Sequence, residues 1–390
     1  MGMTHTELRV SRREAKRRIS DFGFRNAEYQ SGIRNLQSAF TLTELLVVIT
    51  IIAILASLIT AGAMTALRRA KEAAITMEID QLGSAIERFK NETGGAYPPN
   101  AMNDLTVTVA VNDFVRSFRK AFPRHAEPDA LLQRLAGAGT NPLVGGMTGA
   151  EAVYFWLGGF SSDPVYPISG PGGPSFGDGP DSGNQLDLSD EVLESRTRLY
   201  EFDLGRLGPR TDQGQFRDVD NGGVGRYIEY DDPQTGNPRR INLWTYTAKG
   251  TTQPFIYFDA SRYDPATYDL NLAGYDPDIN TSATPQAIKS AYLDSEVDFV
   301  FALKKLREGV TAPASPTDIV FVNKGKFQIL HSGLDSTWGS AEDNPAGFWG
   351  YNSAEYDETQ LVRFPAGPFT GDIADTLTNF TGGTLESAQE

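Results

Sequence analysis

One stretch near the start of the sequence is hydrophobic without interruption. Residues 45–67 form a run of 23 positions without a charged side chain. A helix rises about 1.5 Å per residue, so this run covers roughly 35 Å, enough to cross the hydrocarbon core of a bilayer. It is also longer than the apolar core of an ordinary signal peptide, which has about 7 to 15 residues. The pattern predicts one membrane-spanning helix.

The helical pattern continues beyond this run, but there it is amphipathic. Apolar residues recur at intervals of three and four and therefore share one helix face: Ile75, Ile79, Leu82, Ile86 and Phe89. The pair Gly94 and Gly95 is typical of a helix end. We therefore predict a single helix that ends at about Glu92, with a membrane half at 40–67 and an amphipathic half at 68–93. We expect the amphipathic half to pack on the chain's own domain and not to form a coiled-coil seam.

The residues from 94 to 390 predict an exported α+β domain in which helices come first and a sheet follows. Apolar spacing predicts helices at 113–122, 128–137 and 148–159. Apolar and aromatic runs predict strands at 198–204, 241–247, 254–259, 318–322 and 327–330. A segment rich in Gly and Pro, 170–184, predicts a loop or insertion. The expected fold is a long N-terminal helix packed on a C-terminal antiparallel-sheet domain with long loops.

Charge is distributed unevenly along the chain. Residues 1–39 have a formal charge of +4, so the rest carries −19 of the total of −15. Lys and Arg beside a span stay on the cytoplasmic side, which predicts a cytoplasmic basic leader and an exported acidic domain. This acidity argues against a nucleic acid as partner and favours divalent cations. The chain has no cysteine, so disulfides and thiolate metal sites are excluded.

Glu44 is unusual because it stands at the edge of the hydrophobic run. A carboxylate in that environment needs compensation. A cut after Ala39 would create an amino group on Phe40, one helical turn away, that could pair with Glu44 of the same or a neighbouring subunit. Alternatively, Glu44 caps the helix together with Thr41 or Thr43. The residues alone leave both interpretations open.

The eleven residues from Ala39 to Ile49, AFTLTELLVVI, resemble the cleavage and methylation motif of type IV pilins and type II secretion pseudopilins. The resemblance implies that a prepilin peptidase cuts after Ala39, that Phe40 is N-methylated, and that Glu44 guides assembly. Two positions depart from the family, which usually has Gly at the position of Ala39 and an aliphatic residue at that of Thr43.

The segment that ends the predicted helix, 82–99 (LGSAIERFKNETGGAYPP), is similar to the major pseudopilins and points toward type II secretion. The implied function is a structural subunit of a pseudopilus or of a type IV pilus-like filament. Its implied partners are identical or related subunits, the prepilin peptidase, the assembly machinery of the inner membrane and the lipid bilayer. The implied location is the inner membrane, crossed once with a cytoplasmic N-terminus, and afterwards the filament.

A possible calcium site lies near the C-terminus. Residues 327–339, FQILHSGLDSTWG, resemble the strand and calcium-binding loop of major pseudopilins. The matching residues are Ser332 and Asp335, with Asp372 as the later aspartate of the family; Glu342 and Asp343 are alternative ligands. Calcium accepts six to eight oxygen ligands, which suits such a loop. A solvated acidic loop without a metal is the other interpretation.

Three further patterns are weaker. Gly173-Pro174-Ser175-Phe176-Gly177 has the hydrolase spacing G-x-S-x-G, but its prolines oppose the required strand and helix. His331, Ser332 and Asp335 are triad-type residues that stand too close in sequence. Residues 218–229 partly match a helix-flanked calcium loop, but position 5 of that pattern is Gly222 and position 9 is Arg226, so a solvated turn is the favoured interpretation. We expect no enzymatic function. The alternative function is a membrane-anchored module that recognises a protein or a glycan and uses the pilin-like segment only as its anchor.

Overall fold

A computed structural model describes most of the chain. The described residues are 41–100, 107–141, 143, 146–175, 195–208, 225–261, 274–275, 300–311, 318–338, 364–367 and 369–389. The chain divides into two units, residues 1–60 and 61–390. The fold is α+β, as the sequence predicted: a long N-terminal helix is followed by a domain of helices and small antiparallel sheets.

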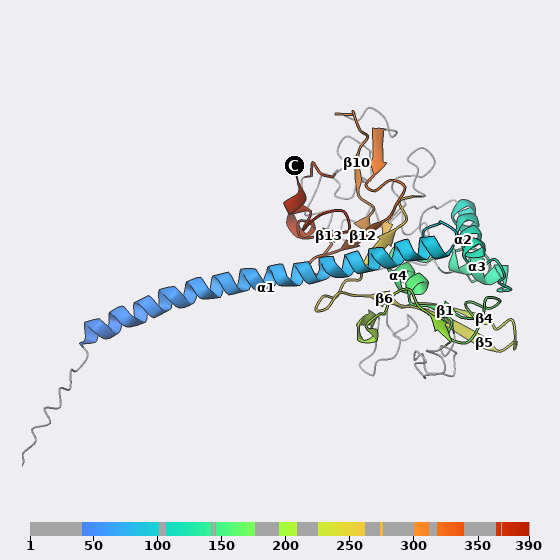
Figure 1. Cartoon of the computed structure of the whole chain (residues 1–390), viewed down its shortest axis with the longest axis horizontal. Coiled ribbons are helices and arrows are strands. Elements are labelled where there is room, and N and C mark those ends of the chain that lie inside the picture. Colours follow the sequence, from blue (N-terminus) through green and yellow to red (C-terminus); the bar gives the residue numbers. More distant parts are fainter. Residues whose placement is uncertain are drawn as a thin grey trace, which may run out of the picture. The chain divides into compact units, whose positions relative to one another are not determined.

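Helix α1 extends over Leu42–Glu92, 51 residues, and so confirms the predicted single helix (Figure 1). It ends where the sequence indicated. The amide of Gly95 donates to the carbonyl of Lys90 over 2.7 Å, and Gly94 and Gly95 have φ of 83° and 89°. Glycine adopts this left-handed conformation without the steric cost that a Cβ would add, so the pair stops the helix.

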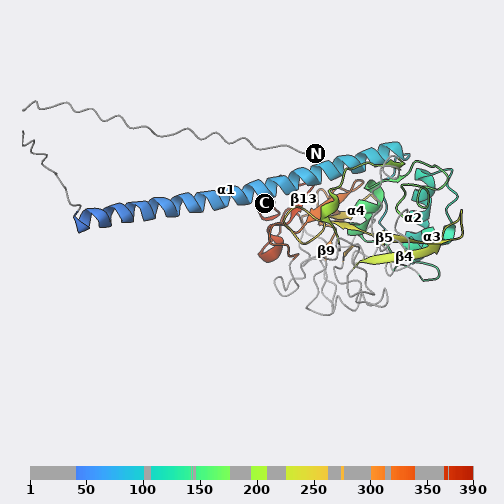
Figure 2. The ribbon, with the colours of Figure 1, turned by 90° about the horizontal axis from the view of Figure 1, so that it is seen from below.

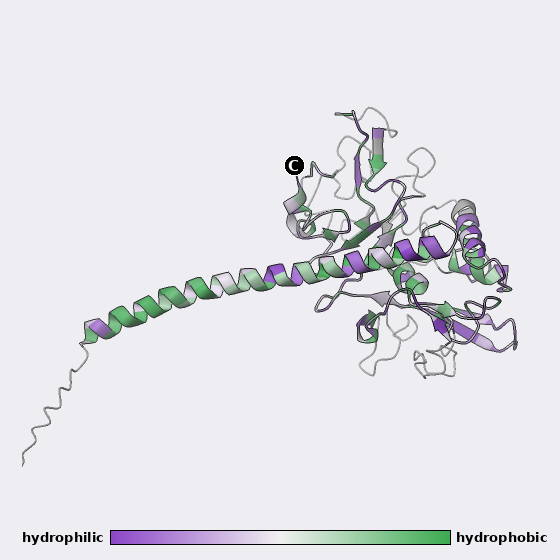
Figure 3. Cartoon of the chain, in the orientation of Figure 1, coloured by the Kyte–Doolittle hydropathy of each residue, from purple (hydrophilic) through white to green (hydrophobic). Residues whose placement is uncertain are grey.

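The two halves of α1 differ in surroundings as they do in sequence. Every residue from 41 to 71 is exposed, and this half is predominantly hydrophobic (Figure 3). The second half buries one face against the domain, through the residues of the predicted stripe together with Gly83 and Ala85. By length and composition α1 can cross a membrane, and its most apolar part is not buried by the protein.

Three shorter helices follow: α2 at Val107–Ala121, α3 at Asp129–Leu135 and α4 at Gly149–Leu157. All three were predicted, within a few residues at each end except for the start of α2. Helix α4 begins with a capping box, in which Thr148 accepts a hydrogen bond from the Glu151 amide and the Glu151 carboxylate accepts one from the Thr148 amide. Both groups are buried, so the cap satisfies backbone donors that water cannot reach.

The strands form several small antiparallel sheets, where the sequence had indicated one. One sheet has three strands, in the order β13-β12-β7: Leu377–Thr378, Gln328–His331 and Ile256–Phe258. The others are pairs: β1 Phe160–Ser161 with β2 Arg196–Thr197, β3 Leu207–Gly208 with β6 Thr245–Tyr246, β4 Arg226–Asp231 with β5 Pro238–Leu243, β8 Gly274–Tyr275 with β9 Val300–Phe301, and β10 Lys304–Leu306 with β11 Ile319–Phe321. Short 3-10 helices occur at Leu204–Arg206, Gly371–Ile373 and Glu386–Ala388.

Aromatic side chains join the C-terminal end of α1 to the rest of the unit 61–390. Phe89 packs edge-on against Trp156 of α4, with ring centroids 5.4 Å apart. Trp156 also donates its indole N–H to the carbonyl of Pro99 over 2.8 Å, and Tyr257 of β7 donates its hydroxyl to Pro98 over the same distance. The turn after α1 is therefore held by two buried side chains that leave no unsatisfied donor.

Polar contacts also hold the same helix. Glu78 accepts hydrogen bonds from Arg206, at 2.8 Å, and from the hydroxyl of Tyr246, at 2.7 Å. The C-terminal segment with β13 lies beside α1 in two perpendicular views (Figures 1 and 2). Residues from the middle and the end of the sequence thus both contact the amphipathic half of α1.

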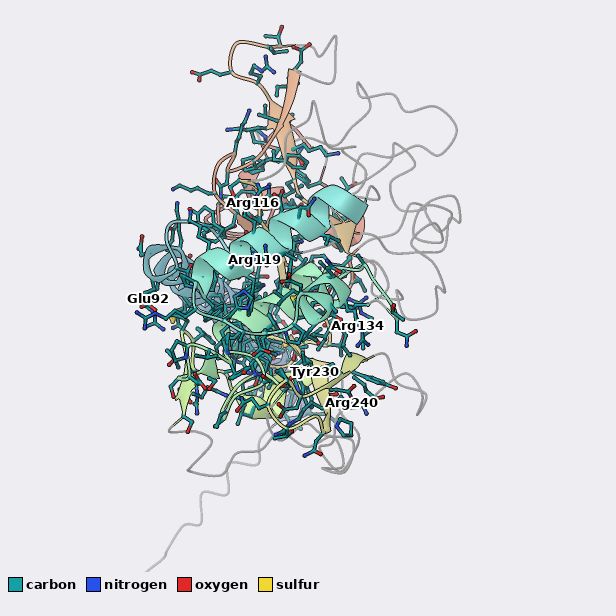
Figure 4. The ribbon with its side chains drawn as sticks, turned by 90° about the vertical axis from the view of Figure 1, so that its right-hand side faces the viewer. Glu92, Arg116, Arg119, Arg134, Tyr230 and Arg240 are labelled. Atoms are coloured by element: carbon teal, nitrogen blue, oxygen red, sulfur yellow. The ribbon has the colours of Figure 1, made fainter. Side chains whose placement is uncertain are left out.

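At the end of the domain near Glu92, α3 lies between α2 and the β4–β5 hairpin (Figure 4). Arg119 of α2 forms an ion pair with Asp129 at 2.7 Å. Arg134 of α3 donates to the carbonyl of Glu229 in β4 over 2.5 Å. Exposed ion pairs of this kind contribute little stability, so the buried apolar residues of α2 and α3 hold this end together.

The predicted strand at 198–204 is wrong. Residues 198–203 have no regular structure, and a 3-10 helix follows at Leu204–Arg206, capped by the side chain of Asp203. Tyr200 and Phe202 pack against each other with centroids 4.6 Å apart and against Tyr246. The alternation of Tyr200 and Phe202 with polar residues is therefore due to ring packing in the core and not to strand pairing.

Strand β4 was missed because residues 226–229 had been read as part of a solvated turn or, less favoured, of a calcium-type loop. Its burial alternates along the strand. The predicted strand at 241–247 is divided between β5 and β6 at Trp244. The predicted strands at 254–259, 318–322 and 327–330 are confirmed by β7, β11 and β12.

Replacing Ile79 by Ala tests the burial of the α1 stripe. Ile79 is 0% exposed, so the change leaves a cavity and should lower the free energy of unfolding by about 2 to 5 kcal/mol. Met77, on the same helix and 61% exposed, is the matched control. Met77→Ala should change the free energy of unfolding by less than about 0.5 kcal/mol. Urea unfolding of the detergent-solubilised full chain measures both. Equal losses would show that the stripe does not pack as described.

Candidate functional site

The first turn of α1 is organised around Glu44. The amide of Thr41 donates to Glu44 Oε2 over 2.8 Å, and the hydroxyl of Thr41 donates to the same oxygen over 2.8 Å. In return, the Glu44 amide donates to Thr41 Oγ1 over 3.2 Å. This reciprocal pattern is a capping box, which satisfies amides that have no partner within the helix.

The cap uses only one oxygen of the Glu44 carboxylate. Within the described part of the chain, Glu44 Oε1 accepts no hydrogen bond. The carboxylate can therefore cap the helix and still accept a second donor, such as an amino group. The two interpretations of Glu44 that the sequence left open are compatible in this geometry. Ala39 and Phe40 lie outside the described residues.

Polar side chains within the apolar half of α1 bond to the helix itself. The hydroxyls of Thr50, Ser57, Thr60 and Thr65 donate to carbonyls three or four residues earlier, over 2.7 to 3.1 Å. Each of these four hydroxyls therefore has an acceptor. A hydroxyl without one would cost several kcal/mol in lipid, on the order of the cost of burying a free polar group. The surface of this half is accordingly suited to lipid or to another apolar helix.

The loop after β12 brings two aspartates together near the C-terminus. Asp375 Oδ2 accepts a hydrogen bond from the amide of Leu334 over 3.0 Å. Asp335, in the same loop, accepts one from the amide of Thr337 over 3.0 Å. Burial, and after it the negative charge of Asp335, raise the pKa of Asp375 to about 6. A cation between these carboxylates would relieve both effects.

Gly333 allows this approach. Its φ is 90°, and a Cβ on it would lie 2.3 Å from the Asp375 carboxyl carbon. Any larger residue would push Asp375 away from the loop. Glycine is therefore required here both for its backbone conformation and for space.

The same loop contains oxygens without hydrogen-bond partners. Among the described residues of this loop and of the C-terminal segment that reaches it, four buried oxygens have none: Ser332 Oγ, Thr337 Oγ1, Thr376 Oγ1 and Asp375 Oδ1. Unpaired buried oxygens are costly and suggest a ligand. An all-oxygen set suits a hard cation such as calcium. Among the described residues no group of three or more His, Asp or Glu could hold a metal alone, so hydroxyl and backbone oxygens would have to complete the set.

The predicted ligands are thus partly brought together. Ser332 and Asp335 lie in the loop as expected. Asp372 belongs to the 3-10 helix Gly371–Ile373, but its side chain is outside the described part of the structure. The carboxylate that reaches the loop is Asp375, which sequence reasoning missed. Glu342 and Asp343 also lie outside the described residues.

The segment around the hydrophobic run matches a known family. Residues 34–60 match the family model of the prokaryotic N-terminal methylation motif. The N-terminal segment of this chain is a methylation motif. Together with the long apolar helix that follows, it is consistent with a type IV pilin-like protein, and it indicates a substrate of prepilin peptidase. No curated protein and no solved structure matches the chain.

The triad-type residues of this pilin-like chain do not form a catalytic arrangement. His331 is fully buried; its Nδ1 accepts a hydrogen bond from the Gly333 amide at 3.1 Å, and its Nε2 lies 3.1 Å from the hydroxyl of Thr251. Neither ring nitrogen contacts Ser332 or Asp335. Burial lowers the pKa of His331 to about 3, so the ring is neutral at physiological pH.

The two other weak patterns are not sites either. Ser175 is fully buried; its hydroxyl donates to the carbonyl of Ile168 at 2.9 Å and lies 2.6 Å from the Tyr230 hydroxyl. In the calcium-type pattern 218–229, Arg226 pairs with Glu151 in the interior, and residues 226–229 form strand β4. The earlier part of that pattern, 218–224, lies outside the described residues.

The buried neutral ring of His331 predicts a dependence of stability on pH. Its pKa is about 3 when folded and about 6.5 when unfolded. The unfolded chain therefore takes up a proton at His331 that the folded chain does not, and the contribution of this residue to stability should fall as the pH drops from 6.5 toward 3. Between pH 7 and 5 that contribution should fall by about 2 kcal/mol. The decrease in stability between pH 7 and 5 should be smaller in His331→Gln than in the native chain. In His125→Gln, where the replaced ring is less buried, this decrease should stay closer to that of the native chain. Urea midpoints at pH 7 and 5 measure the decrease, and an equal decrease in all three proteins would contradict the prediction.

Proposed function

We propose that this chain is a structural subunit of a filament, either a type II secretion pseudopilus or a type IV pilus-like fibre. The observation that carries the proposal is the methylation motif at residues 34–60, followed by a helix whose apolar half is exposed from 41 to 67. A subunit held in the membrane by this helix can exchange lipid for neighbouring helices when it enters a filament. The role is mechanical and requires no catalysis.

Processing would follow the motif. The basic leader, residues 1–39, stays in the cytoplasm, prepilin peptidase cuts after Ala39, and Phe40 becomes the methylated N-terminus. The exported domain then faces the periplasm or the exterior. Partners are copies of this chain or related subunits, together with the assembly machinery of the inner membrane.

Glu44 would guide assembly through its second oxygen. Oε2 holds the helix cap, and Oε1 has no partner among the described residues. The new amine on Phe40, either of the same subunit or of a neighbour, is a cation of the right charge and range to pair with it. A subunit that enters the filament with this pair satisfied avoids a lone charge in an apolar environment.

A Glu44→Gln variant separates assembly from helix capping. The amide oxygen of Gln can still accept from Thr41, but the charge that would pair with the amine is lost. We expect cleavage and membrane insertion to persist, and incorporation into filaments to fall at least about ten-fold, which corresponds to a loss of about 1.4 kcal/mol or more. Thr43→Val, one residue away and uncharged, is the control and should assemble normally.

Two measurements check this. Mass spectrometry of the mature N-terminus should show methylated Phe40 in all three proteins, and sheared surface fractions should report incorporation. An uncut leader in the native chain would refute the processing route. If the native chain and both variants reach the surface at equal levels and none of them forms a filament, the result would instead favour the membrane-anchored binding module.

We also propose that the loop after β12 binds calcium. Ser332, Asp335 and Asp375 would provide oxygens, with backbone carbonyls completing the set, and Asp375 replaces Asp372 in the predicted ligand set. The ion would neutralise the two carboxylates and join the loop to the C-terminal segment. Its role is to order the end of the domain.

Calcium should therefore raise the thermal stability of the full chain. At 1 mM calcium the melting temperature should exceed that in EDTA by a few degrees, because a ligand that binds only the folded state stabilises it. Asp375→Asn should abolish most of this increment, whereas Asp203→Asn, at an exposed cap elsewhere in the domain, should retain it. Equal melting temperatures with and without calcium for the native chain would rule out the site.

A further inference from the structure

A cluster of three cations follows the apolar run at once. Arg68, Arg69 and Lys71 are the first basic residues after the 23 uncharged positions. That run covers roughly 35 Å as a helix, against about 30 Å for the hydrocarbon core. When Leu45 lies at one edge of the core, Arg68 therefore lies at the level of the lipid phosphates on the other side. Figure 3 shows the change from hydrophobic to hydrophilic residues along α1.

The cluster is available to a partner outside the chain. All three residues are exposed, and the Arg68 side chain is 62% exposed. Arg68 Nε bonds to Glu72 at 3.0 Å, and a terminal nitrogen lies 3.9 Å from Asp375 Oδ2. A guanidinium has five N–H donors, so these contacts leave donors free. Within the described part of the chain, Arg69 and Lys71 have no ion pair.

The proposed cleavage makes this cluster more important. The leader carries the cations on the cytoplasmic side, and residues 40–44 contain none. After the cut at Ala39, the cations that flank the span all lie on the exported side. The exported domain has a net negative charge, so an anionic membrane would repel it as a whole but attract this cluster.

We propose that Arg68, Arg69 and Lys71 bind the phosphate groups of anionic lipids in the outer leaflet of the membrane that α1 crosses. Arginine suits this role because its planar guanidinium matches two phosphate oxygens, and lysine adds a point charge. The contact sets the depth of the mature subunit before assembly. The inference rests on the proposed membrane insertion of α1.

The absence of cysteine from the chain allows a direct test. A single Ala66→Cys substitution places a bimane label just before the cluster, and the full chain is reconstituted in mixed vesicles of phosphatidylcholine and phosphatidylglycerol. Two vesicle preparations are compared: in one, phosphatidylcholine carries a nitroxide near its headgroup, and in the other, phosphatidylglycerol carries it. Phosphatidylglycerol should quench the label at least about five-fold more effectively per lipid than phosphatidylcholine, since a single cation near an anionic surface already changes the local ratio by about that factor.

Two triple variants decide whether the cluster causes the preference. Arg68→Gln with Arg69→Gln and Lys71→Gln should bring the two lipids to equal quenching. The matched control removes three exposed cations from α2, by Arg116→Gln, Arg119→Gln and Lys120→Gln, and should keep the preference; two of these are labelled in Figure 4. Circular dichroism verifies that both variants are folded. High salt should reduce the preference of the native chain.

Equal quenching by both lipids in the native chain would overturn the inference. So would a preference that survives in the cluster variant, or one that the α2 control also loses, because net charge would then be its cause. A label that neither lipid quenches would show that α1 does not insert. That result would refute the proposed function as well, and it is distinct from the others.

Discussion

The burial of one stripe of α1 is the interaction on which the rest of this molecule depends. Ile79, Leu82 and Ile86 are almost completely excluded from solvent, and sheets, helices and the C-terminal segment are arranged around them. Small separate sheets of two or three strands are marginal by themselves. The helix gives them a common apolar surface, so that elements distant in sequence can share one core.

That constraint also explains which parts of the fold were predictable. The stripe, the glycine stop and the three short helices follow from periodicity and caps, which are local signals. Sheet assignment was less successful because partners are chosen by tertiary packing. Tyr200 and Phe202 alternate like a strand but belong to an aromatic cluster. Strand β4 was missed because the acidic residues and glycines just before it suggested a solvated turn or a calcium loop.

The candidate sites differ in the same way. Glu44 and Thr41 are three residues apart, so the spacing T-x-x-E already contained the capping box. The aspartate that reaches the loop after β12 is more than forty positions away in sequence from Ser332, and no periodicity connects them. The one local signal was Gly333, whose left-handed backbone and lack of Cβ mark a place where another segment approaches closely. Searching for that segment would have favoured Asp375 as readily as Asp372.

The cap at Thr41 has an electrostatic consequence for the cut chain. Helix α1 begins at Leu42, and the positive end of its macrodipole is concentrated in the first turn. Cleavage would add a positively charged amine two residues before that end, where the dipole repels it. The carboxylate of Glu44 lies in this same turn and attracts both. One acidic side chain therefore offsets two positive charges, of which one is permanent in the helix and the other is created by the peptidase.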